Sequence, residues 1–444
     1  MKTNIRLMVQ AKQPGIAGWP HINFNYEQAV GQIRAVLEDR MPEAEFSVFY
    51  CDDPEAAKVQ FLQDKENFDG LVCITATNNP PVYRACCELA DTQFPVLIAD
   101  LPHAGSGGFL NAAHRVFSGN LPIGLTSSMD YRDIAENVQI IELLKRLKQE
   151  KLLIISDDPD NPMYAPAKRE ALRRDWGVDS VVKSSSDLFA RYEAVPEETA
   201  APLAEKWLNQ SIRSIEPGRG EILSSARLYF ALQEMMEQEG CTALTVDCLS
   251  LFYQNKMKAY PCMTFFEMLN NGRVGICEAD VDSALSAMIA RHGMERPGFV
   301  SDPVLDTSSG QIIYDHCVCS TKMLGYGDPR VSEYYIRSHA EDQQGASVQA
   351  MLPLNLPVTT FKFCTDRQAL ALHTGTAVGN VGLDRGCRTK LAASSQIRNI
   401  MKNWNYDVFA WHRVTVYGDW RDKLLNLARM KGLAVTEEDR DQQQ

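Results

Sequence analysis

The sequence predicts an α/β fold in which two doubly wound, Rossmann-like domains are followed by a β-rich C-terminal domain. Up to about residue 296, short apolar runs alternate with longer stretches of helical periodicity, as in a parallel sheet covered by helices. Beyond Arg296-Pro297-Gly298, helical periodicity becomes sparse, glycine and threonine increase, and turns separate short strands. We therefore expect an N-terminal α/β domain, a second α/β domain and a β-rich domain at 1–149, 150–296 and 297–444.

The predicted strands follow from short apolar runs bounded by polar turns. The first domain has five predicted strands, at 5–10, 46–51, 70–76, 95–101 and 121–127. An amphipathic helix from Asn25 to about Arg40 follows the first strand. In the second domain, a long helical segment at about 197–239 separates four strands, at 151–156, 179–185, 243–249 and 274–280. The third domain has six predicted strands, at 299–304, 311–319, 358–364, 369–375, 387–393 and 412–418. A final helix at 419–433 and a charged tail follow them.

Composition excludes several functional classes. Lys and Arg total 45 against 57 Asp and Glu, a net charge of −12, which gives no general attraction to nucleic acid or anionic lipid. No apolar stretch reaches the roughly 20 residues that a membrane span needs, and the N-terminus leads directly into a strand. The twelve cysteines are dispersed, many within apolar runs, and the Cys317/Cys319 pair lacks the second pair that structural zinc needs. We expect a cytoplasmic, reduced protein without nucleic-acid or membrane partners.

Glu278 is a candidate for chemistry because it stands at the end of the apolar strand GICEAD, just before a predicted helix. The carboxyl ends of parallel strands are the usual site-forming edge of an open α/β sheet. Asp280 and Asp282 fit the first helical turn, where carboxylates cap amides and complement the helix dipole. Glu278 could share that structural role, so position alone leaves both interpretations open.

Two further candidates lie in the third domain. The proline after Asp302 forces Asp302 into an extended conformation. The alternative is that Asp302 stabilises a turn through its side chain, but that role fits Asp306 better, because Thr, Ser and Gly follow Asp306. His412 lies in a strand-like run, where a lone histidine is either a packed core residue or a ligand, and His316 has the same two interpretations. Together, Glu278, Asp302 and His412 supply an oxygen and nitrogen set that suits a divalent metal, most simply Mn²⁺.

Four segments carry a resemblance to a known family: VGICEADVDSALSAMI, RPGFVSDPV, DRGCRTK and WHRVTVYGDW. They resemble the L-fucose isomerase and L-arabinose isomerase superfamily, most closely its L-fucose isomerase branch, of which this chain would be a short member. The resemblance implies that Glu278, Asp302 and His412 hold a catalytic metal in an L-fucose isomerase-like fold. It also implies an aldose–ketose isomerase that acts on an open-chain sugar through an enediolate, with Glu278 and Asp302 as the catalytic acid and base.

The same resemblance implies a homo-oligomer, commonly a hexamer, whose active sites are shared between subunits. The loop after the first strand would then reach a neighbouring subunit, with Trp19 and His21 contacting sugar, or it is a packed surface loop. The substrate would be a hexose or a modified hexose, such as a deoxy sugar or the sulfonated sugar sulfoquinovose. Further candidate substrate-binding residues are His316, Arg219 and Arg388, and Arg385 is another arginine that could face an anionic group.

Two rival functions use the same fold elements. A metal-free sugar-binding or sensing protein also has two doubly wound domains, but it would need neither the three candidate ligands nor a β-rich third domain. A dinucleotide-dependent oxidoreductase is disfavoured because no GxGxxG follows the first strand; the glycine-rich AGSGGF at 104–109 follows a later strand with the wrong spacing.

Overall fold

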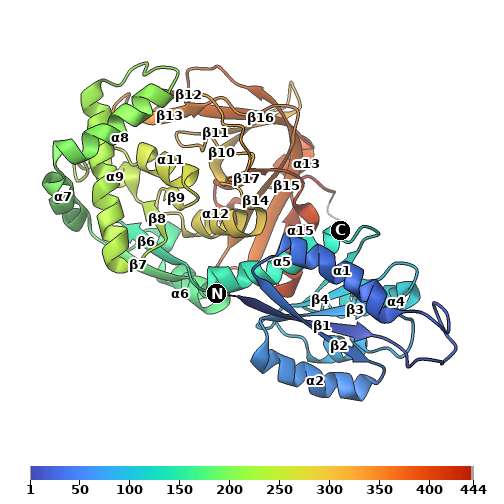
Figure 1. Cartoon of the computed structure of the whole chain (residues 1–444). Coiled ribbons are helices and arrows are strands. Elements are labelled where there is room, and N and C mark those ends of the chain that lie inside the picture. Colours follow the sequence, from blue (N-terminus) through green and yellow to red (C-terminus); the bar gives the residue numbers. More distant parts are fainter. Residues whose placement is uncertain (1, 442–444) are drawn as a thin grey trace. The chain divides into compact units, whose positions relative to one another are not determined.

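A computed structural model describes residues 2–441 and divides the chain into two compact units. The first contains residues up to 146 together with 422–434, and the second contains 147–421 and the segment from 435. Parallel sheets precede a β-rich C-terminal region (Figure 1), so the predicted mixed α/β class is confirmed. The division into three domains stays a prediction.

The first unit is built on a parallel five-stranded sheet in the order β2-β1-β3-β4-β5. Its strands are β1 (Thr3–Gln10), β2 (Ala44–Cys51), β3 (Gly70–Thr75), β4 (Val96–Asp100) and β5 (Ile123–Ser127). The helices between them are α1 (Tyr26–Arg40), α2 (Pro54–Asn67), α3 (Tyr83–Leu89), α4 (Ser106–Ser118) and α5 (Arg132–Leu147). Side chains of α2, α3 and α4 share one hydrophobic core with one face of the sheet. β3 is buried along its whole length, as expected for a central strand covered on both faces.

A helix from near the C-terminus completes this unit. In α15 (Arg421–Met430), Asn426 receives a hydrogen bond from the Leu125 amide (3.0 Å) and donates one to the Leu125 carbonyl (2.9 Å). A side-chain amide that satisfies both backbone groups of one residue fixes the helix at β5. The predicted helix at 419–433 is thus present in a shorter form.

The second unit contains a parallel four-stranded sheet in the order β7-β6-β8-β9. Its strands are β6 (Lys151–Ile155), β7 (Asp179–Lys183), β8 (Ala243–Val246) and β9 (Val274–Cys277). The connecting elements are η1 (Pro162–Tyr164), α6 (Pro166–Trp176), α7 (Ser185–Ala194), α8 (Glu197–Gln210), α9 (Arg219–Glu239), α10 (Cys248–Tyr253), α11 (Cys262–Asn270) and α12 (Val281–Met294). Almost every residue of α12 is buried, because this helix contacts β9 on one side and β14 and β17 on another.

The β-rich region is an antiparallel sheet in the order β14-β17-β10-β11-β16-β15-β18, and it closes on itself because β14 also pairs with β15. Its strands are β10 (Phe299–Asp306), β11 (Gln311–His316), β14 (Pro357–Cys364), β15 (Ala369–Asn380), β16 (Thr389–Ser394), β17 (Arg413–Tyr417) and β18 (Ala434–Glu437). The remaining elements are the hairpin β12 (Tyr334–Arg337) and β13 (Ser347–Ala350), with α13 (Ile397–Asn403) and α14 (Tyr406–Phe409).

Where the sequence predicts only a charged tail, the structure has β18 followed by a buried carboxylate. Glu438 is fully buried, and its two oxygens bind Arg413 (2.7 Å) and His373 (2.8 Å). The tail therefore packs into the sheet because it neutralises a buried guanidinium.

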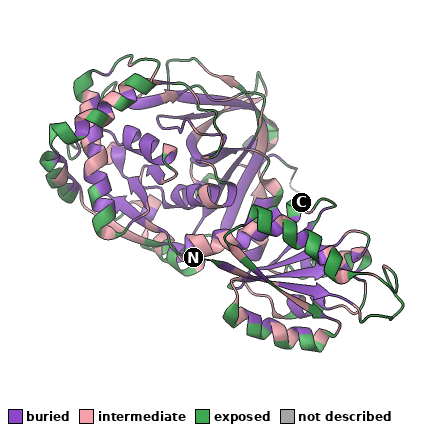
Figure 2. Cartoon of the chain, in the orientation of Figure 1, coloured by how far each residue is buried: buried purple, intermediate pink, exposed green. Residues whose placement is uncertain are grey.

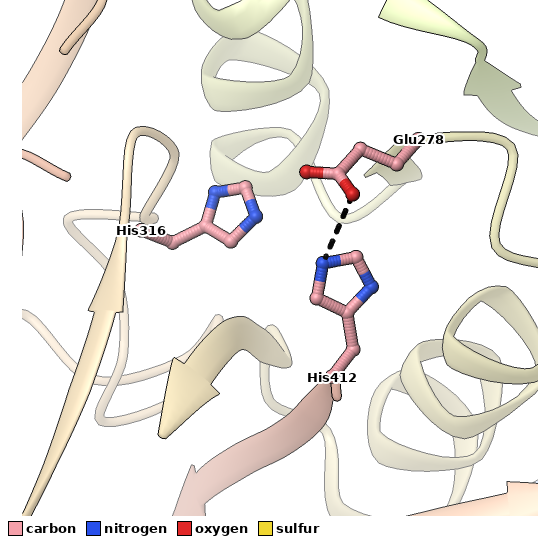
Figure 3. Close-up of side chains that lie close together, drawn as sticks. All are labelled: Glu278, His316 and His412. Carbon is pink, nitrogen blue, oxygen red and sulfur yellow. Dashed lines mark ion pairs between the residues drawn. The ribbon is translucent and has the colours of Figure 1, made fainter. Parts of the chain in front are cut away.

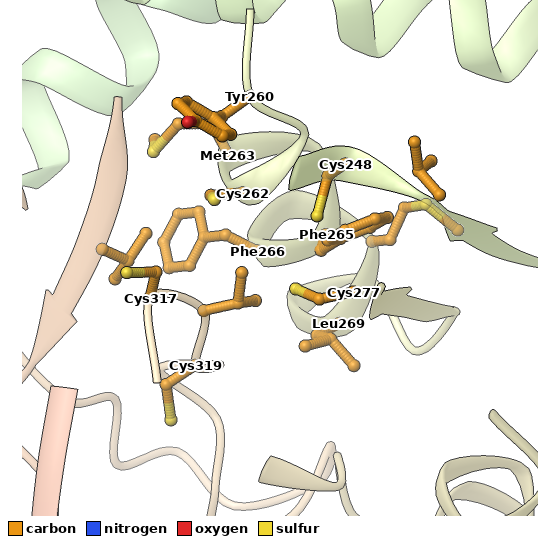
Figure 4. Close-up of a cluster of buried hydrophobic side chains, with 14 of the residues drawn as sticks. Cys248, Tyr260, Cys262, Met263, Phe265, Phe266, Leu269, Cys277, Cys317 and Cys319 are labelled. Carbon is orange, nitrogen blue, oxygen red and sulfur yellow. The ribbon is translucent and has the colours of Figure 1, made fainter. Parts of the chain in front are cut away.

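Most central strands of each unit are buried, while many of the peripheral helices have exposed faces (Figure 2). In the second unit the core around α11 combines aromatic rings with cysteines (Figure 4). All twelve cysteines are free thiols, and all except Cys87 and Cys387 are buried, as predicted for small apolar side chains. None of the described helices is long and apolar enough to cross a membrane.

Candidate active site

A strained backbone turn after β9 sets the position of the Glu278 side chain in the second unit. Glu278 and Ala279 both adopt left-handed conformations, with φ values of 62° and 55°, which cost non-glycine residues about 1 kcal/mol or more each. Asp280 then caps α12 by accepting a hydrogen bond from the Ser283 amide (3.0 Å). The strained turn places the Glu278 side chain beside the start of the helix rather than within its first turn, so the capping role falls to Asp280.

Four of the predicted site residues meet near this turn. His412 lies directly before β17, and its Nε2 is 3.6 Å from Glu278 Oε2 and 3.6 Å from Asp302 Oδ1 of β10. The potential ligand atoms of Glu278, His316 and His412 lie within 4.8 Å of one another (Figure 3). The structure thus brings together side chains from the end of β9, from β10, from the end of β11 and from the start of β17.

Asp280 orients the His412 ring. Its Oδ2 lies 2.9 Å from His412 Nδ1 and also binds Lys362 Nζ (2.7 Å) and the Ser283 hydroxyl (2.6 Å). Since the carboxylate accepts a hydrogen bond from Nδ1–H, the neutral ring presents the lone pair of Nε2 to Glu278 and Asp302. A carboxylate behind a histidine is the usual arrangement at metal sites, where it fixes the ring and raises its basicity.

His316 presents the opposite tautomer. Its Nδ1 accepts a hydrogen bond from the Cys317 amide (2.9 Å), so the neutral ring carries its proton on Nε2. His316 therefore offers a hydrogen-bond donor to the site. By distance alone it could hold a metal with Glu278 and His412, but its lone pair is already used.

Several buried polar atoms at the site lack partners. Among the described residues, no hydrogen bond reaches His412 Nε2, His316 Nε2 or Asp302 Oδ1, although each atom is inaccessible to water. Buried polar groups in proteins are nearly always paired, so their convergence indicates a place for a polar ligand or a cation. One imidazole lone pair with two carboxylates is a donor set that fits a divalent ion such as Mn²⁺.

The charges of the site are strongly coupled. Burial raises the pKa of Glu278, but its close interaction with His412 outweighs burial and brings the pKa to about 2. Burial lowers the pKa of His412, but Asp280 and Glu278 outweigh it and raise the value to about 9. Without a metal, His412 is thus an imidazolium paired with carboxylates, and a cation at Nε2 would replace its proton.

A second cluster of potential metal ligands in this unit already has ion-pair and hydrogen-bond partners. Asp282, Cys364 and Asp366 also lie within metal-ligand distances of one another. However, the Lys168 ammonium binds Asp282, whose other oxygen accepts hydrogen bonds from the Thr365 amide and hydroxyl (2.9 and 2.7 Å). This group is an ion-pair network that supports α12.

The other predicted substrate-binding residues lie elsewhere. Trp19 is 50% exposed and His21 is exposed in a loop of the first unit. Arg219 is exposed at the start of α9 and pairs with Glu205. Arg388 is buried, and its guanidinium binds the Ser338 carbonyl and hydroxyl (2.9 Å each). Arg385 is exposed.

Two residues that support His412 are not predicted from the sequence: Asp280, which binds the imidazole, and Lys362, which binds Asp280. The sequence predicts only a capping role for Asp280, whereas the side chain caps α12 and also binds the imidazole. Lys362, which is buried and neutralises Asp280, was not considered. A single lysine inside the apolar run VTTFKFC was the available signal, because a buried lysine requires a carboxylate partner.

Comparison with known proteins gives distant sugar isomerases. No family model matches the chain. The chain is similar to a sulfoquinovose isomerase of Alkalicoccus urumqiensis, with 21% identity over 307 residues that cover 67% of each chain. Sulfoquinovose isomerases of Priestia aryabhattai and Priestia megaterium are also 21% identical, over 305 residues that cover 68% of this chain and 67% of theirs.

Proposed function

We propose that this chain is a metal-dependent aldose–ketose isomerase that acts on an open-chain sugar through an enediolate. The observation that carries the proposal is the convergence of Glu278, Asp302 and His412, with Asp302 Oδ1 and His412 Nε2 buried and unpaired within the described chain. The similarity to three sulfoquinovose isomerases supports it independently.

In this proposal Glu278, Asp302 and His412 hold the cation, most simply Mn²⁺. When bound, the cation polarises the carbonyl of the sugar and stabilises the negative charge that develops when a proton leaves C2. The oriented Nε2 lone pair of His412 and the low pKa of Glu278 suit this role, because both ligands must be unprotonated to bind metal.

The same carboxylates would carry the proton between C2 and C1. Each can bind the cation through one oxygen and face the substrate with the other, and Asp302 is the more open of the two, with a side chain 42% exposed against 21% for Glu278. His316 would donate its Nε2 proton to a substrate oxygen. This role agrees with its tautomer and with the absence of any partner for Nε2 in the described residues.

The relatives support a sugar substrate, and the family resemblance suggests its class. We propose a hexose or a modified hexose, either a deoxy sugar or a sulfonated sugar such as sulfoquinovose, in an L-fucose isomerase-like arrangement of two Rossmann-like domains and a β-rich domain. Arg219 is the more available arginine for a sulfonate, since Arg388 is buried and already hydrogen-bonded. We also propose a homo-oligomer, commonly a hexamer, in which the exposed Trp19 and His21 complete a neighbouring site.

Chelation tests the proposal. The purified protein is stripped of metal and assayed with a panel of aldoses that includes sulfoquinovose, with and without added Mn²⁺. We expect turnover only with the metal, and at least a hundredfold loss of activity after stripping. Undiminished turnover after complete metal removal contradicts the mechanism, and sugar binding without turnover under all conditions identifies a binding protein.

A further inference from the structure

A row of charged residues extends from the candidate metal ligands across the antiparallel sheet. The register pairs Asp302 of β10 with Asp315 of β11, and Asp315 with Lys390 of β16. Directly paired residues of antiparallel strands project from the same face of the sheet. The β10–β17 register ends at Ser301 and Arg413, and one further step places His412 opposite Asp302. Asp315 thus lies on the face of the site, one strand beyond Asp302.

The carboxylate of Asp315 has an unused acceptor. The residue is only 7% exposed, and in the described part of the chain no hydrogen bond reaches Oδ1. Lys390 Nζ lies 3.7 Å from Oδ1, too far for a hydrogen bond, and donates to the Cys387 carbonyl. Lys390 therefore compensates the charge of Asp315 and leaves Oδ1 open to another donor.

The backbone is shaped around this carboxylate. Gly386 has φ of 74°, and a Cβ at this position would lie 2.5 Å from Asp315 Oδ2. Position 386 therefore requires glycine for two reasons: the left-handed backbone conformation and the close approach of the backbone to Asp315. The loop backbone thus passes close to Oδ2, while Oδ1 has no hydrogen-bond partner among the described residues.

We propose that Asp315 is a substrate-binding residue whose Oδ1 accepts a hydrogen bond from the hydroxyl on C3 of the open-chain sugar. The inference rests on the proposed function, which brings C1 and C2 to Asp302 and Glu278. Asp315 lies one strand farther from His412 than Asp302, whose Oδ1 is 3.6 Å from His412 Nε2, so a metal held by Glu278, Asp302 and His412 leaves Asp315 available. Neighbouring strands are about 4.8 Å apart, a distance that the next hydroxyl along the sugar chain can span through one O–H···O hydrogen bond of about 2.8 Å. Asp315 then selects the configuration at C3.

Binding of open-chain polyols tests this inference without turnover. The Mn²⁺-loaded protein is titrated calorimetrically with sorbitol, mannitol and galactitol, and with the 3-deoxy analogue of the tightest of them. Mn²⁺ binding to the stripped protein is measured separately. The variant is Asp315→Asn, and Asp306→Asn is the matched control, because Asp306 is at the far end of β10 and bound by Ser308 and Ser309.

We expect Asp315→Asn to raise the Kd of the best hexitol at least tenfold. The Kd values of its 3-deoxy analogue and of Mn²⁺ should change less than twofold, and Asp306→Asn should behave as wild type. A hexitol Kd unchanged in Asp315→Asn overturns the inference, as does an equal rise in the Mn²⁺ Kd, which would make Asp315 a metal ligand. If Asp315→Asn does not fold, Asp315→Asn/Lys390→Gln, which removes both charges, carries the same expectations.

Failure of the proposed function gives a different result. In that case the wild type binds none of the three hexitols and turns over no aldose in the panel. Both the proposed function and this inference are then wrong. A wild type that binds a hexitol and an Asp315→Asn variant that binds it equally well overturn the inference alone.

Discussion

Each of the two parallel sheets carries a carboxylate at its carboxyl edge, and the two carboxylates differ in how they are satisfied. In the first unit, Asp100 at the end of β4 accepts hydrogen bonds from Thr75 (3.2 Å) and Ser127 (3.3 Å) of the neighbouring strands. In the second unit, Glu278 pairs with His412 only at 3.6 Å, and His412 Nε2 has no hydrogen bond from the described residues. A carboxyl group at this edge becomes a candidate site when its surroundings leave polar atoms unpaired.

The pKa values of the two carboxyl groups move in opposite directions. Burial raises the pKa of Asp100, and the hydroxyls of Thr75 and Ser127 compensate only in part. Burial also acts on Glu278, but His412 reverses the effect and lowers its pKa to about 2. The Asp100 environment therefore destabilises the carboxylate anion, whereas the Glu278 environment stabilises an anion that can bind a cation.

The largest expected effect comes from Glu278→Gln. The amide has nearly the same shape but cannot serve as an anionic ligand or as a base, so we expect kcat/KM for the best aldose to fall at least about 10³-fold, about 4 kcal/mol. Steady-state kinetics at saturating Mn²⁺ measure the loss, and circular dichroism checks the fold.

The matched control for that variant is Glu267→Gln. Glu267 is also buried in the second unit, but Trp207 (2.8 Å), Lys206 and Asn271 (2.9 Å) already bind its carboxylate. We expect lost stability and unchanged activity from this control. Retention of more than a tenth of wild-type kcat/KM in Glu278→Gln would remove Glu278 from the mechanism.

A smaller effect is expected from pH in the metal-free protein. The folded pKa of His412 is about 9 and the unfolded value is about 6.5. Protonated His412 therefore makes its full contribution to the free energy of unfolding below about pH 6.5, and this contribution disappears as the pH rises to about 9. Glu278, with its pKa of about 2, gives the matching loss as the pH falls below about 4.5. Because the two shifts share the interaction between Glu278 and His412, they are not added, and the contribution is on the order of 3 kcal/mol.

Denaturant unfolding of the stripped protein at pH 6 and pH 9.5 measures this difference. His412→Asn serves as the control, because it cannot form the imidazolium and should lose less stability between these pH values. An equal loss in both proteins would assign the pH dependence to other groups. Added Mn²⁺ should bind more tightly at the higher pH, because it no longer competes with a proton at Nε2.

The sequence predicts much of this architecture because the information is local. Apolar runs with helical or alternating periodicity reveal most strands and helices, and the strand end before Glu278 is visible in GICEAD. The Asp280–His412 hydrogen bond joins residues 132 positions apart, so no local pattern could reveal it. The Asp302–Asp315–Lys390 row likewise depends on the register of three strands, which a single sequence does not specify. β18 is missed because its run of four residues is short, and distant contacts fix the segment, including those of Glu438 with Arg413 and His373.

The smallest expected effect comes from Asp100→Asn, the counterpart of Glu278→Gln in the first unit. The asparagine oxygen still accepts one hydroxyl, and the other hydroxyl can rotate to accept from the amide nitrogen, so the hydrogen bonds are retained. The variant also avoids the burial of an ionised group, which the raised pKa of Asp100 identifies as unfavourable. We therefore expect the free energy of unfolding at pH 7 to change by less than about 1 kcal/mol, with kcat/KM unchanged. A hundredfold loss of kcat/KM without unfolding would instead show that satisfied hydrogen bonds do not distinguish a structural carboxylate from a functional one at these sheet edges.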